Sequence, residues 1–337
     1  MSDKVRLNLE VLETREVPSG VVDVIVTNVL GMARVTIVGD AAGNNIAISR
    51  VPGPDLGRFR ITASGGTSLS LISAPLGWLP VAPTSTLIVI QPPGFFGNYI
   101  EDITINMQDG NDNVTLQDLR PNFTHIFGQL TVVMGGGNDQ LTIQDVEMRQ
   151  LMAVLGEGND QLTMRNVLVN QGAQIYGGSG NDNVWCLAPT PADLNVVNGN
   201  LHVDLGTGNN QFIVPSSNNP TSPNLDVNGL SVFIWSAGGK DIIRFGTPGS
   251  QNRSFDHSVL GGVTRIRAGG GNDILWFRNA IFNVLYGLLE AGNDTINHWP
   301  DNNVTVGLRA LVDGGSGTDS KPATFLRSPI WTIISFP

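Results

Sequence analysis

The chain has 337 residues, of which 41 are Gly and 19 are Pro, and hydrophobic residues make up 41% of it. This composition supplies apolar side chains for a packed core together with many turns, which excludes a disordered chain. The formal net charge of -10 disfavours nucleic acid as a partner, and the single cysteine, Cys186, excludes an internal disulfide framework. No apolar run reaches the roughly 18 residues that a membrane-spanning helix needs.

Residues 1–20 are predicted to be a flexible export or targeting segment. Positions 7–19 read LNLEVLETREVPS. This run resembles the short LExLExRxxPS segment at the N-terminus of planctomycete extracellular proteins. The resemblance implies a bacterial protein that is exported to the cell surface or the extracellular space.

Residues 21–100 are predicted to form irregular β coils that also cap one end of a longer array. They contain strand-like runs, for example at 33–38 and 85–90, which are separated by loops rich in Pro and Gly. A cap is expected because a stack of strands needs a covered edge to avoid pairing with other chains.

Residues 101–320 are predicted to be a repeat array, with residues 321–337 as a C-terminal cap strand. Nine Gly-rich segments recur at steps of 21 to 32 residues, which is the period of a solenoid with loops inserted into some copies. Each segment ends on an acidic or amide residue. These are Asp112, Asp139, Asp160, Asp182, Asn210, Asp241, Asp273, Asp294 and Asp319.

Apolar residues alternate with polar ones on both sides of each Gly-rich segment. Leu130, Val132 and Met134 precede one copy, and Leu141 and Ile143 follow it. This period of two is typical of strands with one buried face. We therefore expect an all-β protein that forms a right-handed parallel β-helix, or β-solenoid, of about nine or more coils. A second corner, capped by an Asx side chain, is expected at Asp118, Asp145, Asn166 and Asn279.

One Gly-rich segment, GGSGNDNVW at 177–185, fits every defined position of the pattern GGxGxDxUx, where U is a large apolar residue. This pattern resembles the calcium-binding repeats of repeats-in-toxin (RTX) proteins, although the copies here are not contiguous as they are in that family. The resemblance implies several bound Ca²⁺ ions. The candidate ligands are Asp112, Asp139, Asp160, Asp182, Asp241, Asp273, Asp294 and Asp319, with turn backbone at Gly137, Gly158, Gly180, Gly271 and Gly292.

Two interpretations of these turns compete. Calcium takes six to eight oxygen ligands, and stacked carboxylates about 5 Å apart repel one another unless a cation lies between them. Alternatively, Gly supplies the turn and the Asx side chain only accepts hydrogen bonds from backbone N–H groups, with no metal.

Three functional hypotheses follow. The first is an exported, calcium-binding structural or adhesive protein whose partner is a cell-surface or matrix polysaccharide or protein. Its candidate ligand surface contains the outward-facing residues Trp185, Trp235, Trp276, Arg265 and Arg267. The second is a polysaccharide lyase or hydrolase in which His202 and Asp204, two positions apart on one strand face, would act as acid and base. The third is a metal-free, passive envelope component.

Overall fold

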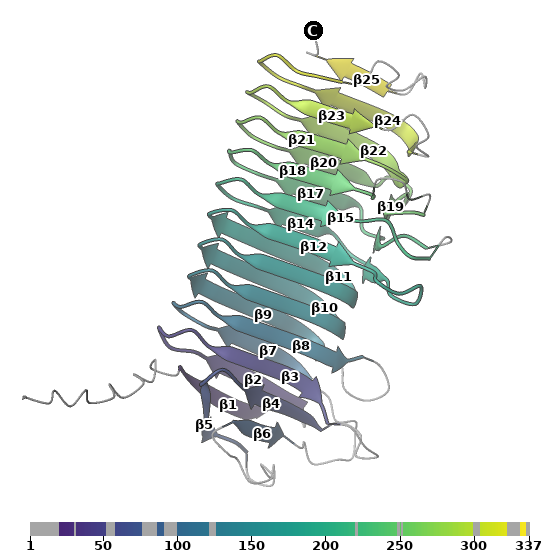
Figure 1. The fold of residues 1–337 in the computed structure, drawn as a ribbon. Coiled ribbons are helices and arrows are strands. Elements are labelled where there is room, and N and C mark those ends of the chain that lie inside the picture. The colour runs from purple at the N-terminus through teal and green to yellow at the C-terminus, as the bar shows by residue number, and fades with distance from the viewer. Residues whose placement is uncertain are drawn as a thin grey trace, which may run out of the picture.

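The computed structural model describes residues 20–29, 32–51, 58–75, 86–90, 100–120, 126–219, 222–247, 250, 252–298, 304–321 and 331–334. Within these ranges the protein is all-β, with 25 strands in one hydrogen-bonded sheet system and no helix. Most neighbouring strands run parallel, and from β7 onward they stack in sequence order toward the C-terminal end of the molecule (Figure 1).

The first six strands mix antiparallel and parallel pairing. Strand β1 pairs antiparallel with β2, and β4 pairs antiparallel with β3 and β6, whereas β1 pairs parallel with β5. Strands β2 and β3 then pair parallel with β7 and β8, which joins this region to the long array. The bounds are β1 Val21–Val29, β2 Met32–Val38, β3 Asn45–Arg50, β4 Phe59–Ala63, β5 Ser68–Ser73 and β6 Leu87–Ile90.

The remaining strands form three sets of parallel pairings, which we call the first, second and third faces. The first face contains β3, β8 Asn113–Leu119, β10 Gln140–Glu157, β11 Gln161–Ser179, β12 Asn183–Leu187, β15 Gln211–Val214, β18 Ile242–Phe245, β21 Ile274–Phe277 and β23 Thr295–His298. The second face contains parts of β10 and β11, then β13 Asn195–Val197, β16 Leu225–Val227, β19 Phe255–His257 and the start of β22 Ala280–Leu288.

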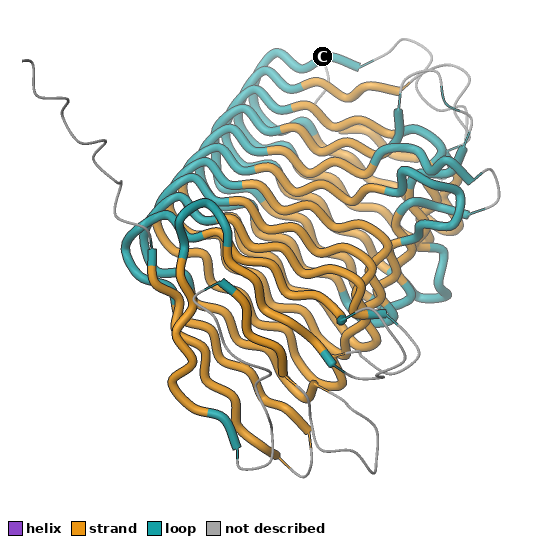
Figure 2. Tube along the Cα trace, turned by 60° about the horizontal axis from the view of Figure 1, so that its bottom comes forward, coloured by secondary structure: helices purple, strands orange, loops and turns teal. Residues whose placement is uncertain are grey.

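The third face begins with β2 and continues through β7 Ile100–Asn106, β9 Ile126–Gly136, the ends of β10 and β11, β14 Leu201–Asp204, β17 Ser231–Trp235, β20 Val263–Arg267, the end of β22, β24 Thr305–Asp313 and β25 Trp331–Ile334. Each Gly-rich turn leads from a strand of the third face to a strand of the first face. Figure 2 shows these turns as a continuous row of loops along one edge of the array.

Residues that alternate along each strand face the interior and stack on their equivalents in the next strand. Leu141 is in register with Val114 on one side and with Leu162 on the other, and all three are at most 1% exposed. Cys186 is one of these interior residues, and burial raises the pKa of its thiol to about 12. Toward the C-terminal half a buried aromatic cluster fills the interior, with ring centroids 4.8 to 6.0 Å apart between Phe212, Phe245, Phe255, Phe277 and Phe282. Burial of each Phe side chain contributes about 1.5–3 kcal/mol to the free energy of folding.

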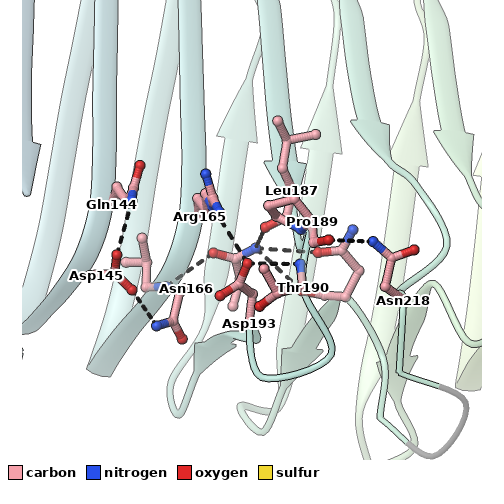
Figure 3. A network of polar contacts seen from close by, with 12 residues as sticks. Gln144, Asp145, Arg165, Asn166, Leu187, Pro189, Thr190, Asp193 and Asn218 are labelled. Carbon is pink, nitrogen blue, oxygen red and sulfur yellow. Dashed lines mark hydrogen bonds and ion pairs between the residues drawn. The ribbon is translucent and has the colours of Figure 1, made fainter.

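The second corner lies where the sequence predicts it. Asp118, Asp145, Asn166 and Asn279 all have left-handed backbone conformations, with φ between 50° and 57°. Asn and Asp adopt this conformation more readily than other non-glycine residues. Their side chains also bond between neighbouring turns, because Asn166 Nδ2 donates to Asp145 Oδ1 (Figure 3). Loops beside this corner are held by further polar contacts, such as Arg165 Nε to Asp193 Oδ2 at 3.4 Å.

Candidate functional site

The Gly-rich turns stack backbone directly on backbone. At Gly158 and Gly180 the φ angles are +128° and +123°, and a Cβ atom at either residue would collide with a carbonyl oxygen of the preceding turn. Both the conformation and the contact therefore require glycine. The same holds for the other turn glycines that the sequence singles out, which are Gly137, Gly271 and Gly292.

Ten acidic or amide side chains form a hydrogen-bonded column at this edge, which we call the Asx column. In every step from Asn44 to Asp319, the Oδ1 atom of one member accepts a hydrogen bond from the backbone N–H of the preceding member, at 2.6 to 2.9 Å. The members are Asn44, Asp112, Asp139, Asp160, Asp182, Asn210, Asp241, Asp273, Asp294 and Asp319. Oδ1 therefore plays the role that the metal-free interpretation assigns to it.

A second ladder runs the opposite way, one residue before the column. Asn111 Oδ1 accepts from Asn138 N at 2.7 Å, and Asn138 Oδ1 accepts from Asn159 N at 2.8 Å. Where a turn carries an Asn-Asp dipeptide, it thus binds the following turn through Asn and the preceding turn through Asp. These side-chain bonds satisfy backbone N–H groups that the strand ladders leave unpaired.

The second oxygen of each column aspartate has no such partner. Among the described residues, all eight Oδ2 atoms are buried without a hydrogen bond, and the residues themselves are between 0% and 6% exposed. Buried polar atoms nearly always have a partner, so eight equivalent exceptions in a row need a physical explanation. The aspartates are Asp112, Asp139, Asp160, Asp182, Asp241, Asp273, Asp294 and Asp319.

The two asparagines in the column show what lies next to that second atom. Asn210 Nδ2 donates to the carbonyl oxygens of Gly206 and Gly208 at 3.5 and 3.3 Å. Asn44 Nδ2 donates to the corresponding carbonyls four and two residues earlier, Asp40 O and Ala42 O, at 3.3 and 2.7 Å. Because the turns are equivalent, we infer that the Oδ2 atom of each aspartate faces the same pair of carbonyl oxygens. An ionised carboxylate there requires a cation, and a neutral one requires a proton.

Burial acts on the protonation of the column. Burial, together with the neighbouring column carboxylates, raises the pKa of Asp112, Asp160 and Asp273 to about 7. Burial likewise raises the pKa of Asp182 and Asp241 to about 6. The pKa values of Asp139 and Asp294 are also raised by burial. Hydrogen bonds from backbone N–H groups oppose these shifts at every one of these positions.

The oxygen atoms available at the column are of the type that calcium binds. In the described part of the chain no three His, Cys, Asp or Glu side chains converge on one point, so an ion here would depend on backbone oxygens as well as on carboxylates. The turns supply both, because each has one unpartnered carboxylate oxygen next to backbone carbonyls. Ca²⁺ accepts such mixed oxygen ligands, and its charge would offset the burial of the carboxylates.

The other predicted site residues lie on two different faces. Trp185 and Trp276 are on β12 and β21 of the first face, and their buried indole Nε1 atoms have no hydrogen-bond acceptor among the residues that the structure describes. Trp235, Arg265 and Arg267 are on β17 and β20 of the third face. The structure therefore separates the predicted ligand surface into two parts.

His202 and Asp204 lie on the outer side of β14, in the third face. The His202 ring stacks on Phe233, with centroids 5.2 Å apart and planes inclined by 8°. Asp204 Oδ1 accepts a hydrogen bond from Gly206 N at 3.0 Å, so this carboxylate closes the start of a Gly-rich turn.

Sequence reasoning missed Asn44, the first member of the column. The later column residues all have Gly two positions earlier, whereas Asn44 has Ala42 there, so the Gly-rich pattern does not identify it. The predicted export segment spans residues 1–20, and all of it except residue 20 lies outside the described residues.

Searches against protein-family models, curated proteins and solved structures find no match to this chain. In the ranges that the structure describes, no helix is long and apolar enough to cross a membrane.

Proposed function

We propose that this chain is an exported structural or adhesive protein of the bacterial cell surface or extracellular matrix, stabilised by calcium bound along the Asx column. In this proposal the three faces are the sides of a right-handed parallel β-solenoid, and each Gly-rich turn is one corner of a coil. The RTX-like turn pattern and the N-terminal resemblance support calcium binding and export. The observation that carries the proposal is the row of eight buried Oδ2 atoms without partners.

The column residues would hold the ions, with the carboxylate of one turn and nearby backbone carbonyls as ligands. The candidates are the eight aspartates together with the turns around Gly137, Gly158, Gly180, Gly271 and Gly292. A bound cation would stabilise the ionised column, because it replaces repulsion between carboxylates and carbonyls with attraction. Asp139, Asp160 and Asp182 offer the longest run without inserted loops, at spacings of 21 and 22 residues.

Calcium binding is tested by equilibrium dialysis at pH 8 with radioactive calcium. The test variant is Asp139→Asn/Asp160→Asn, which should fold because Asn44 and Asn210 occupy equivalent places in the column. The control variant, Asp109→Asn/Asp118→Asn, removes the same charge from two exposed residues outside the column. We expect the wild type and the control to bind the same number of ions, more than one per chain, and the test variant to bind fewer. Absence of binding by the wild type, or equal binding by all three proteins, would refute calcium coordination by the column.

A further inference from the structure

A belt of aromatic side chains crosses the outer side of the third face. Tyr176 on β11 contacts His202 on β14, with ring centroids 5.6 Å apart, and His202 stacks on Phe233 of β17 at 5.2 Å. Phe233 then meets Trp235 edge-on at 6.4 Å. All four side chains are partly exposed. The belt therefore presents ring surface to the outside on strands that the parallel ladder holds rigidly.

The belt begins at a definite point along the array. On the earlier strands β9 and β10, the positions in register with His202 are Thr131 and Met152, and those in register with Tyr176 are Val133 and Val154. From β11 to β20 aromatic and arginine side chains occupy most of the equivalent positions, the exceptions being Gln174 on β11 and Asp204 on β14. The fold itself does not demand aromatic residues at these outward positions, because the preceding strands form the same face without them.

Three exposed arginines continue the belt toward the C-terminal end. Arg267 lies over the Trp235 ring at 5.6 Å and forms an ion pair with Glu290. Arg265 and Arg309 lie over the Tyr286 ring, each at 5.9 Å. Within the described ranges neither Arg265 nor Arg309 has a carboxylate partner. Two unpaired guanidinium groups next to one ring are notable in a chain with a formal net charge of -10.

A cavity of about 290 Å³ adjoins the other end of the belt. Its lining includes the side chains of Gln129, Gln150, Gln174, Asn200 and His202, which come from consecutive turns of the array. Amide groups offer both donors and acceptors, and His202 belongs to the cavity and to the belt. Hydrogen-bonding groups, ring surface and cationic groups thus follow one another along one face.

We propose that this face binds an acidic polysaccharide that runs along the array from the cavity to Arg309. Aromatic rings pack against the apolar C–H faces of sugar rings, amides bond their hydroxyl groups, and planar guanidinium groups bind carboxylates or sulfates with two parallel hydrogen bonds. The inference supplies the partner for the adhesive role proposed above and rests on that role. It depends on the third face, whereas calcium binding depends on the Asx column.

The proposal is tested by affinity electrophoresis of the full chain in gels that contain polygalacturonate, dextran sulfate, neutral dextran or polyglutamate. We expect retardation by one or both acidic polysaccharides, with the comparison between the two identifying carboxylate or sulfate as the recognised group. Neutral dextran and polyglutamate should retard the chain much less. Retardation by neither acidic polysaccharide, or equal retardation by polyglutamate or neutral dextran, would overturn the proposal.

Two variants locate the site. Arg265→Gln/Arg309→Gln should weaken polysaccharide binding about tenfold or more, because two charge-assisted contacts are lost. Phe233→Leu, which keeps an apolar side chain but removes the ring, should weaken it as well. The matched control, Arg50→Gln/Lys240→Gln, removes two exposed cations away from this face and should bind like the wild type. An equal loss in the control would place binding elsewhere and contradict the proposal. Because calcium binding is measured on column variants, failure of one proposal is distinguishable from failure of the other.

Discussion

The turn glycines determine how closely successive turns can approach. At Gly158 the backbone has φ of +128°, and the carbonyl oxygen of Gly137 occupies the place that a Cβ atom would take. This φ lies beyond the left-handed region near +57° that Asn and Asp can adopt, so the conformation alone already favours glycine. The carbonyl contact excludes every side chain as well, and its share of the cost can be tested.

Gly158→Ala should lower the free energy of unfolding by about 3 kcal/mol or more, because both the strained backbone and the collision must be accommodated. Gly261→Ala provides the control, since Gly261 has φ of +80° but no atom within 4 Å of the added methyl group. Gly261→Ala should lower the free energy of unfolding by only about 1–2 kcal/mol. Urea denaturation of both variants measures the difference, and equal costs would show that close approach of the backbones is not what selects glycine.

The repeating element is one turn with its following strand, and its polar side chains bond to both neighbouring turns. Asn138 Oδ1 accepts a hydrogen bond from the backbone N–H of Asn159, while Asp139 Oδ1 accepts one from the backbone N–H of Asp112. Each element therefore needs a neighbour on both sides to satisfy its hydrogen bonds. Stability in such an array resides mainly in the contacts between adjacent repeats.

The second corner supplies a test of these contacts. Asn195 is fully buried, its Oδ1 accepts from Val167 N at 3.1 Å, and its Nδ2 donates to Leu187 O at 3.0 Å. Asn195→Ala leaves both groups without these partners and should cost about 2 kcal/mol. Asn198 is exposed, and its Nδ2 donates to Asn170 Oδ1. The substitution Asn198→Ala should lower the free energy of unfolding by less than about 0.5 kcal/mol. If chemical denaturation gave the same loss for both, buried bonds between turns would not be a main source of stability.

Across the whole molecule, the parts that sequence predicts are those governed by short periods. The alternation of Leu130, Val132 and Met134 specifies the buried face, and all three are 0% exposed. The positive φ angles at Asp145 and Asn166 follow from residue type at a corner. The recurrence of aspartate in the Gly-rich segments likewise identifies eight of the ten column members. The same alignment identifies a ninth member, Asn210.

Other features depend on register between distant segments and have no local signal. Pairing of β3 with β8 brings Asn44 beside Asp112, which lies 68 residues away. The antiparallel pairing of β3 with β4 breaks the period of the later repeats, so the repeat gives no information about it. The ring contacts among Tyr176, His202 and Phe233 arise only when β11, β14 and β17 lie side by side. Alternation shows that these side chains point outward but not which of them meet.

The buried column as a whole should be stable as carboxylic acids at low pH and as carboxylates only with a cation. Folding raises the pKa of Asp112, Asp160, Asp182, Asp241 and Asp273 from about 3.8 to about 6 or 7. A raised pKa in the folded state means that the stabilisation is complete below pH 3.8 and is lost as the pH rises through 6 to 7. Bound calcium should reverse this loss, since a site at 100 times its dissociation constant contributes about 2.7 kcal/mol.

The most direct test is the melting temperature of the full chain, followed by circular dichroism at pH 5 and at pH 8, with millimolar calcium and after calcium has been removed by ion exchange. We predict that the calcium-depleted protein melts at a lower temperature at pH 8 than at pH 5. Calcium should raise the melting temperature strongly at pH 8 and weakly at pH 5, where protons compete for the column. A melting temperature at pH 8 that does not respond to calcium would contradict calcium binding by the column and leave the turns as hydrogen-bonded corners alone.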